Sequence, residues 1–418
     1  MDNPTVKQDK FPVKIFVCIL VLGFFGLSLL TNMQGLFYVT VSEHFGVARS
    51  QFSLYYTVQS LAAMVTLFFA GNIMTKHQNK LSLIVAAAVI TQFVGYFLFA
   101  KAQSIVLFFV VAVFLGIAGG FDTHLLIGVL TNNWFAKKNG FVLGLSTALA
   151  SVAGAIISPK MSVIIASNWR TGYLVIAFGV LITLLPVSFI IKFSPAQEGR
   201  RPYGAAELEA EADKNTNLDT SGVPYKTALK SPAFYLCALL LFFATGWSCF
   251  TFAMPGYISS LGYDASVVGF CASAYLIGGV IGKFLGGTLN DALGFLKSMI
   301  VLTVIGVAGM ILLIFAAPNS STMVIIGGVL FGVGMGICGV HPPLIVRACF
   351  GNKDYSRIYS NVGSLIWVAS MVLIPIYNLI FDSTGSYVPA MWAAIVMIVL
   401  ALVCGSTAVA SSKKLKRE

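Results

Sequence analysis

Charged residues are scarce in this sequence, and the common motifs of soluble catalysis are missing. Only 10% of the 418 residues are charged, against about 25% in soluble domains, and 58% are hydrophobic. No GxxxxGK[ST] loop, nucleophile elbow or HExxH motif occurs, which argues against ATP as the driving force and against hydrolysis. The alternating pattern of barrel strands is also missing. We therefore expect an integral membrane protein of α-helices that is not an enzyme.

Cysteine is sparse, and its spacing indicates no special chemistry. No CxxC pair and no Cys/His spacing typical of a metal site occurs. Each cysteine stands alone in or beside an apolar run, so we interpret all of them as small hydrophobic residues within helices. We accordingly expect no metal and no cofactor. The seven are Cys18, Cys237, Cys249, Cys271, Cys338, Cys349 and Cys404.

Long apolar runs dominate the sequence. A helix needs about 20 apolar residues to cross a bilayer. The first run is too long for the core of a signal peptide and no small-residue cleavage site follows it, so we expect it to remain as a span. We predict twelve spans, at residues 15–38, 51–75, 81–100, 105–132, 139–165, 170–192, 232–258, 265–289, 297–317, 322–347, 355–380 and 387–409.

One long polar segment separates two sets of six spans. It covers residues 193–231 and contains prolines, glycines and an acidic stretch, which is typical of a solvated linker. We therefore predict an all-α integral membrane protein with two pseudo-symmetric six-helix bundles. The N-terminal bundle covers residues 1–192, the C-terminal bundle covers residues 232–418, and the cytoplasmic linker joins them.

The net charge of +11 is distributed so that it orients the chain. With both termini on one side, 21 of the 26 lysines and arginines fall in the loops and ends of that side and four on the other. Because basic residues are enriched on the cytoplasmic side, we expect cytoplasmic termini, and no nucleic acid is needed to explain the charge. Short loops and compact length favour a bacterial inner membrane. Lys283 is the one basic residue left inside a predicted span.

The two halves resemble each other at a constant offset. Gly46 follows span 1 as Gly262 follows span 7, and Gly71 lies near the end of span 2 as Gly287 lies near the end of span 8. Both pairs are 216 residues apart. Parallel internal repeats of this kind are typical of transporters built from two bundles.

The loop that begins at Gly287 resembles the signature of the major facilitator superfamily, roughly G-x-x-x-D-x-x-G-x-[RK]-[RK]. Gly287, Asp291, Gly294 and Lys297 carry it, whereas the first-half copy is degraded and has Thr75 in place of the aspartate. The resemblance implies a transporter that works by alternating access. It implies that Asp291 pairs across the halves or caps the next helix, and that spans 1, 4, 7 and 10 line the central cavity.

A second stretch, NNWFAKKNGFVLG, resembles the oxalate/formate antiporter and monocarboxylate transporter branch. This resemblance implies a small organic anion as the substrate, and it places Lys283 at the position of that branch's substrate-binding cation in span 8. Because span 11 lacks a second cation here, we expect a monoanion. The motif is carried by Trp134, Phe135, Lys137, Lys138, Gly140 and Gly144.

Lys283 is too deep to reach the cytoplasmic headgroups easily. It lies eight residues from Asp291, which is about 12 Å along a helix, in a hydrocarbon layer about 15 Å thick on each side. A charge at that depth costs about 2.5–3.5 kcal/mol, so the side chain must face protein or water. We favour binding of a substrate anion. A structural or proton-coupling ion pair and a snorkelling side chain are the alternatives.

One carboxylate and two histidines share this interior. Asp122 in span 4 is a candidate proton-coupling site or a partner of Lys283, and the alternative is a hydrogen-bonded packing residue. His124 and His341 lie in repeat-related spans 4 and 10, and each can donate to a carboxylate or carry a proton, or simply pack. Without nearby carboxylates or cysteines they do not predict a metal site.

Other polar and aromatic residues complete the expected substrate site, although membrane helices also use such residues to hold each other together. At the cytoplasmic side we expect Arg347 to act in gating with Asp291, Gly287 and Gly294. The further pocket candidates are Asn32, Gln34, Trp247, Tyr275, Asn361 and Trp367.

Two functions stay open at this point. We favour a monomeric secondary transporter of small organic anions, in particular monocarboxylates, that works by proton symport or anion exchange. The alternative is a proton-coupled exporter or permease for neutral or amphipathic solutes, in which Lys283 and Asp122 relay the proton.

Overall fold

The structure is a computed structural model, and it describes most of the chain. The acidic part of the predicted linker lies outside the described residues, and so do the side chains of His124 and Ser356. The described segments are residues 11–205, 222–316, 320–351 and 353–415.

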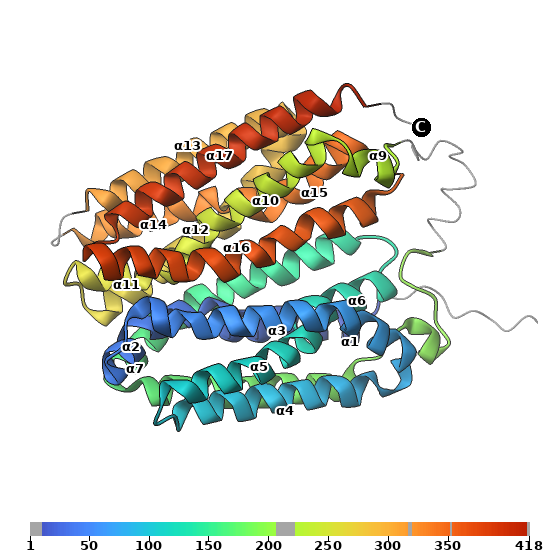
Figure 1. Cartoon of the computed structure of the whole chain (residues 1–418). Helices are drawn as coiled ribbons and strands as arrows, with labels where there is room; N and C mark the ends of the chain where they lie inside the picture. Colours follow the sequence, from blue (N-terminus) through green and yellow to red (C-terminus); the bar gives the residue numbers. More distant parts are fainter. Residues whose placement is uncertain (1–10, 206–221, 317–319, 352, 416–418) are drawn as a thin grey trace, which may run out of the picture. The chain divides into compact units, whose positions relative to one another are not determined.

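The described chain is helical almost throughout (Figure 1). Eleven helical segments are long and apolar enough to cross a membrane. The longest, α7 (Asn139–Ile190), contains Asn168 with non-helical angles of φ −159° and ψ 100°, so it comprises two spans. This break falls between the fifth and sixth predicted spans. The prediction of an all-α protein with twelve membrane helices is therefore confirmed.

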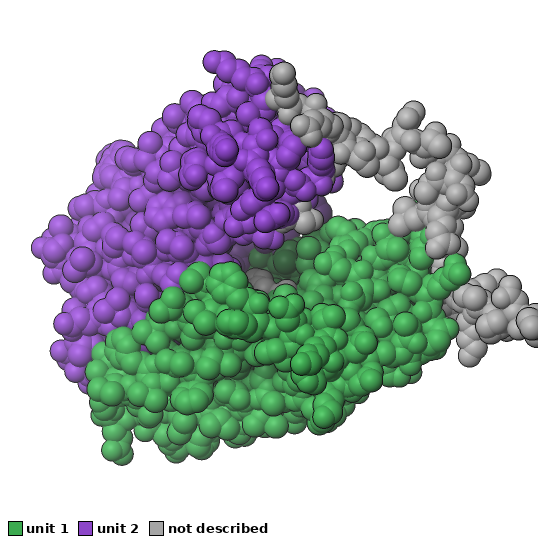
Figure 2. Space-filling view, turned by 45° about the vertical axis from the view of Figure 1, so that its right-hand side comes forward, with its two compact units in different colours: residues 1–33, 58–154, 168–218 green, residues 34–57, 155–167, 219–418 purple. Residues whose placement is uncertain are grey.

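The chain forms two compact units (Figure 2). Unit 1 comprises residues 1–33, 58–154 and 168–218, and unit 2 comprises residues 34–57, 155–167 and 219–418. Two inner segments of the predicted N-terminal bundle thus belong to unit 2. The bundle limits at residues 192 and 232 stay a prediction.

The first half of the chain contains both long and interrupted helices. Its first span is divided into four short helical pieces. The elements are α1 (Val13–Val21), the π-helix η1 (Leu22–Asn32), the 3-10 helix η2 (Gln34–Phe37), α2 (Tyr38–Phe45), α3 (Arg49–Lys76), η3 (Gln78–Lys80), α4 (Leu81–Ala100), α5 (Ile105–Asp122), α6 (His124–Trp134), α7 (Asn139–Ile190) and η4 (Pro195–Glu198).

The second half repeats the alternation of long and interrupted helices. Within unit 2, α12 lies beside α14, and α10 lies beside α17 (Figure 1). The elements are α9 (Tyr225–Leu229), α10 (Pro232–Cys249), η5 (Phe250–Phe252), α11 (Met254–Ser260), α12 (Ala265–Leu293), α13 (Phe295–Ile314), α14 (Ser321–Gly334), α15 (Gly336–Phe350), α16 (Tyr355–Thr384) and α17 (Val388–Ser412).

Glycines allow α12 to approach α14 and α15 closely. A Cβ atom at Gly278 would lie 2.0 Å from the carbonyl oxygen of Val329, and one at Gly282 would lie 2.2 Å from that of Val333. Helices in lipid gain most of their association from such backbone proximity, because lipid tails are as apolar as the side chains. This seam fixes the height and rotation of α12, and with them the position of Lys283.

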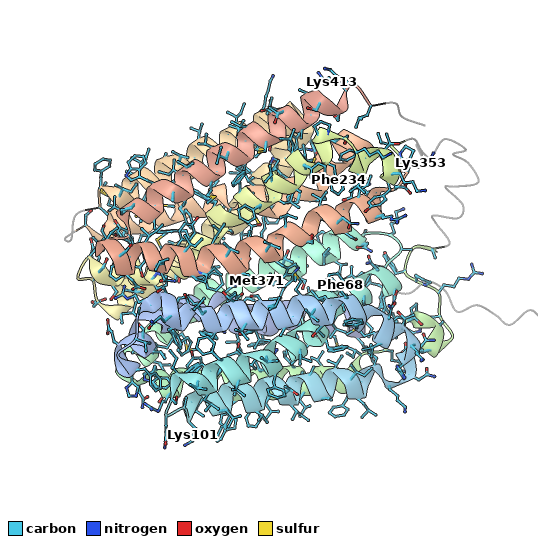
Figure 3. All side chains as sticks on the ribbon, in the orientation of Figure 1. Phe68, Lys101, Phe234, Lys353, Met371 and Lys413 are labelled. Atoms are coloured by element: carbon cyan, nitrogen blue, oxygen red, sulfur yellow. The ribbon has the colours of Figure 1, made fainter. Side chains whose placement is uncertain are left out.

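The repeat-related glycines Gly46 and Gly262 both have a positive φ angle, as their equivalent positions predict. Gly46 ends α2 with φ +64°, and Gly262 follows α11 with φ +82°. Both lie in the left-handed region that only glycine enters readily. In unit 2, Lys353 and Lys413 lie at the same end of the helices, as the positive-inside distribution requires (Figure 3).

Candidate functional site

Four spans are interrupted near their middle, and they are the spans expected to line the cavity. Span 1 passes from α1 through η1 and η2 to α2, and span 7 passes from α10 through η5 to α11. Span 4 breaks at Thr123, between α5 and α6, and span 10 breaks at Met335, between α14 and α15. Breaks within membrane helices free backbone polar groups and are typical of substrate and ion sites.

Lys283 lies on α12 and passes over a glycine of α15. A Cβ atom at Gly339 would lie 3.0 Å from Cε and 3.1 Å from Cγ of Lys283. The aliphatic stem of the lysine is therefore in contact with the backbone of α15, just beyond the break at Met335. A side chain at position 339 would obstruct the path of the Lys283 stem, so this path needs glycine.

Sequence reasoning missed three polar side chains of unit 2 that are linked to the lysine through Cys338. Cys338 is close enough to Lys283 for the two to interact electrostatically. Its Sγ lies 3.7 Å from Oγ1 of Thr245 on α10, and Tyr359 on α16 also acts on it. No carboxylate among the described residues forms an ion pair with Lys283. We call Lys283, Cys338, Thr245 and Tyr359 the lysine cluster.

Cys338 was missed because a lone cysteine in an apolar run carries no pattern. The structure distinguishes it by exposure, since it is half-buried whereas the other six cysteines are buried. The adjacent Gly339 is the only sequence signal that points to it, because a small residue on one helix leaves room for a large one on its neighbour.

His341 lies on α15 about one turn after Cys338, and its side chain is buried. Its ring is fully buried and packs on Phe295 of α13, with 5.3 Å between the ring centres. Neither ring nitrogen makes a hydrogen bond of normal geometry within the described chain, although the backbone of Gly336 acts on the ring. The described residues contain no group of three potential metal ligands.

The other predicted pocket residues of unit 2 occupy different environments. Trp247 is buried on α10, 4.8 Å from the ring of Phe331 and against Gly306 and Gly334. Tyr275 is buried on α12 on another side of Phe331.

Two predicted residues lie on α16, and a third lies in η2. Asn361 is exposed and donates to the carbonyl of Arg357, whereas Trp367 is half-buried. Gln34 is buried and accepts a hydrogen bond from Tyr55 at 2.9 Å. The structure therefore gathers the lysine cluster but does not gather every predicted residue around it. Their roles as ligands stay predictions.

The candidate residues of unit 1 flank its broken helices. Asp122 is fully buried at the end of α5, next to Thr123, whose angles of φ −124° and ψ −102° are non-helical. Among the described residues neither carboxylate oxygen finds a hydrogen bond of normal geometry, although Gln92 and Thr123 interact with the carboxylate. At the end of η1, Asn32 donates to the carbonyl of Ala150 at 3.0 Å. The side chain of His124 lies outside the described residues.

Asp122 belongs to unit 1 and Lys283 to unit 2. An ion pair between them stays a prediction.

The predicted gating residues lie at the end of α12 and α15. Gly294 has φ +82° and ends α12, and space around Gly287 is open. Asp291 is exposed, and α13 begins at Phe295, after Gly294, without a side-chain cap, so Asp291 does not cap it within the described chain. Arg347 is exposed, and its guanidinium lies 5.7 Å from the ring centre of Tyr355. A gating role for these residues stays a prediction.

A second polar cluster in unit 2 surrounds Arg49, which the sequence marks only as one of the four basic residues on the predicted outer side. Two carboxylate oxygens of Asp382 accept from the amides of Arg49 and Ser50, at 3.3 and 2.8 Å, and so cap the start of α3. The Arg49 guanidinium stacks on Phe381 at 4.3 Å and donates to the hydroxyl of Tyr387. We call these residues, together with Asn378, the Arg49 cluster.

Tyr387 links the Arg49 cluster to α16. Its hydroxyl donates to Oδ1 of Asn378 at 3.2 Å. Burial raises the pKa of Tyr387, and Arg49 partly opposes that shift. The phenol therefore stays protonated, and able to donate, through neutral and mildly alkaline pH.

Comparison with known sequences identifies the family but leaves the substrate open. The profile of the Major Facilitator Superfamily matches residues 20–245 and 236–417. The chain is 24% identical over 262 residues to a probable sulfoacetate transporter of Cupriavidus necator, covering 60% of this chain and 58% of that protein. It is 24% identical over 291 residues to a hexuronate transporter of Bacillus subtilis, covering 68% and 65%. The chain thus spans less than two thirds of the length of these relatives.

Solved structures share the fold at low sequence identity. A D-xylose–proton symporter has a TM-score of 0.71 at 12% identity, and the alignment covers 96% of this chain and 98% of that one. A bacterial homologue of the human lysosomal transporter Spinster, inward-facing and unoccupied, has a TM-score of 0.66 at 12% identity, with 97% and 98% covered.

Proposed function

The chain belongs to the major facilitator superfamily, and we propose that this multi-pass membrane transporter is a secondary carrier of small organic anions, in particular monocarboxylates. Being such a transporter, it is not an enzyme. The observation that carries the proposal is Lys283, a cation within a membrane helix that has no carboxylate partner among the described residues. A substrate anion would supply the missing charge.

The lysine cluster supports an anion better than a cation or a neutral solute. Cys338 brings a thiol within electrostatic reach of Lys283, and Thr245 and Tyr359 add hydroxyl groups that interact with Cys338. All three can donate hydrogen bonds to an oxyanion. The substrates after which the two relatives are named fit this chemistry, because sulfoacetate and hexuronate are both anions.

We further propose that the chain belongs to the oxalate/formate antiporter and monocarboxylate transporter branch, on the strength of the WFAKKNG stretch. We also propose an inner-membrane location with cytoplasmic termini, and a monomer as the working unit. The charge distribution supports the orientation, with 21 basic residues on one side and four on the other.

Proton coupling has a candidate of its own in Asp122. A fully buried carboxylate without a hydrogen bond of normal geometry is well suited to taking up and releasing a proton during transport. If transport is proton symport, Asp122→Asn abolishes accumulation driven by a pH gradient and leaves anion exchange intact. The same residue supports the alternative function, a proton-coupled exporter or permease for neutral or amphipathic solutes.

Thermal stabilisation of the purified protein by candidate ligands tests the proposal. We expect a monocarboxylate from a panel to raise the unfolding midpoint of the wild type but not of Lys283→Gln, with Lys226→Gln as a charge-matched control in the exposed helix α9. Stabilisation by lipophilic cations or neutral solutes, and by no carboxylate, would instead support the exporter or permease.

A further inference from the structure

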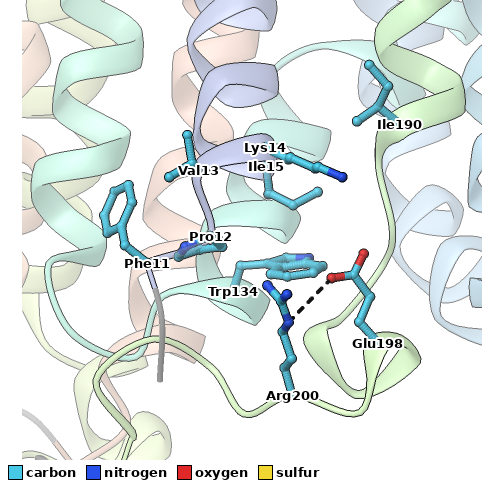
Figure 4. Close-up of a pocket in the computed structure, with 9 residues that line it drawn as sticks. All are labelled: Phe11, Pro12, Val13, Lys14, Ile15, Trp134, Ile190, Glu198 and Arg200. Carbon is cyan, nitrogen blue, oxygen red and sulfur yellow. Dashed lines mark ion pairs between the residues drawn. The ribbon is translucent and has the colours of Figure 1, made fainter. Parts of the chain in front are cut away.

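A cavity of about 240 Å³ in unit 1 has no part in the transport function proposed above (Figure 4). Its walls are the first turn of α1, the last residue of α6, the last residue of α7 and the segment that follows α7. It belongs to one unit only, and no residue of the lysine cluster lines it.

The height of the cavity in the membrane follows from its walls. Val13 begins the first span, Trp134 ends the fourth and Ile190 ends the sixth, and all three residues line the cavity. Three spans therefore start or stop at this point. The level at which spans end is the boundary between hydrocarbon and lipid headgroups. With the orientation proposed above, this boundary lies in the cytoplasmic leaflet.

The cavity carries more positive than negative charge. Lys14 and Arg200 line it together with one carboxylate, Glu198. That carboxylate is already engaged, since it lies 3.4 Å from Nζ of Lys192 and 3.9 Å from Nε of Arg200. Lys14 has no acidic partner among the described residues. In the view of Figure 4, Trp134 lies between Lys14 and Arg200.

The backbone at the cavity adds to this preference for an anion. Helix α1 begins after Pro12 without a side-chain cap, and its first turn contains no acidic residue. The amide of Val13 donates to the carbonyl of Phe11 at 2.9 Å, and the positive end of the helix dipole at this turn favours negative charge. The positive charge of Lys14 in the same turn destabilises the helix unless a bound anion compensates that charge.

The rim of the cavity suits a lipid better than a soluble anion. Val13 is 60% exposed and Ile190 is 49% exposed, directly beside the charged groups. Trp134 is 2% exposed and donates its indole N–H to the carbonyl of Lys192, so it forms an inner wall of the cavity and not part of this rim. A ligand that combines a phosphate with acyl chains would contact both kinds of surface.

We propose that this cavity binds the phosphate headgroup of an anionic phospholipid of the cytoplasmic leaflet. Lys14 and Arg200 hold the phosphate, and the acyl chains run along Val13 and Ile190. Glu198 keeps its pairing with Lys192 when Arg200 turns to the lipid. Occupancy would tie α1 to the end of α7 and to the start of the linker.

Native mass spectrometry of the full-length protein in detergent tests this site. With added phosphatidylglycerol or phosphatidylcholine, we expect the wild type to retain the former preferentially. The double variant Lys14→Gln/Arg200→Gln should lower the bound fraction of phosphatidylglycerol about tenfold or more. The matched control Lys76→Gln/Lys80→Gln removes the same charge from exposed positions of unit 1 on the same predicted side and should bind as the wild type does. The swap Lys14→Arg/Arg200→Lys should retain most of the binding.

Three results would overturn the proposal. They are an equal loss in the control variant, no loss in the cavity variant, and displacement of phosphatidylglycerol by millimolar inorganic phosphate, which would make the ligand a soluble anion. If the double variant does not elute as a folded monomer, Lys14→Gln alone carries the test, because Lys14 has no ion pair to lose with any residue that the structure describes. Uptake is not the readout, so the outcome does not depend on the proposed transport function.

Discussion

At the scale of single residues, Gly339 decides where the ammonium group of Lys283 can go. The side chain of Lys283 crosses α15 at Gly339, where no side chain blocks it. Its neighbours there offer hydrogen bonds but no negative charge, so the lysine is left with an unsatisfied charge in the part of the chain that the structure describes. This is the physical reason for reading it as a binding residue.

Gly339→Ala should weaken transport without weakening the fold. The added methyl group would lie 3.0 Å from Cε of Lys283 and displace the flexible side chain. Misplacing a binding group by about 1 Å can cost tenfold or more, so we expect KM to rise about tenfold. Alanine is the better helix former by about 1 kcal/mol, so the unfolding midpoint should not fall. Gly279→Ala, whose methyl group would meet its nearest neighbour at 3.8 Å, should leave KM unchanged.

Cys338 offers a direct reporter of the lysine cluster. It is the one half-buried cysteine of the seven, and the positive charge of Lys283 should attract an anionic thiol reagent. We expect labelling by an anionic methanethiosulfonate to exceed that by its cationic counterpart, to fall when a transported carboxylate is present, and to disappear in Cys338→Ser. Labelling with the same charge preference in Lys283→Gln would contradict this arrangement.

At the scale of elements, the contact between α12 and its neighbours depends on glycines that have no room for a side chain. Gly282→Ala would place a methyl group 2.2 Å from the carbonyl oxygen of Val333, which belongs to backbone and cannot move aside. We expect a loss of about 1–3 kcal/mol or more, visible as a lower unfolding midpoint. On the same helix, Gly287→Ala meets nothing within 4 Å and should be tolerated or slightly stabilising. Equal effects of the two substitutions would refute the close packing.

The Arg49 cluster joins the start of α3 to the end of α16. Asp382→Ala removes the cap from two amides of α3 and should cost about 1 kcal/mol. Arg49→Lys should also destabilise, because lysine keeps the charge but loses the planar stacking on Phe381. Glu43→Gln is the control, since this carboxylate is 67% exposed at 3.6 Å from Arg49 and such surface pairs contribute little. Thermal unfolding of the purified variants ranks the three, and a larger effect at Glu43 than at Asp382 would contradict the assignment.

At the scale of the whole molecule, the sequence predicted the spans but not their interruptions. Apolar run length alone located twelve helices, including the boundary near Asn168 inside the continuous helix α7. Whether a span stays α-helical depends on packing. The π-helix η1 has Gly23 pressed against Ser146, which no one-dimensional pattern records. In a membrane both faces of a helix are apolar, so the periodicity that marks the packed face of a soluble helix is weak.

The candidate site was predictable only where charge marked it. Lys283 and Asp122 stood out because charges in spans are costly. Thr245, Cys338 and Tyr359 resemble ordinary residues of a membrane helix, and only the fold links them to Lys283 through Cys338. The aspartate of the signature loop shows the reverse case, because the motif allowed helix capping and the structure shows that Asp291 does not cap α13.

We propose above all that Lys283 binds the anion that this transporter carries. Uptake of a radiolabelled monocarboxylate, identified by thermal stabilisation, into proteoliposomes tests it most directly, with wild type, Lys283→Arg and Lys283→Gln reconstituted at equal levels. Loss of one partner of a desolvated charge pair costs about 2–5 kcal/mol, so Lys283→Gln should bind at least about thirtyfold more weakly and lose uptake, whereas Lys283→Arg should keep part of it. Uptake by folded Lys283→Gln at the wild-type rate and KM would contradict the account.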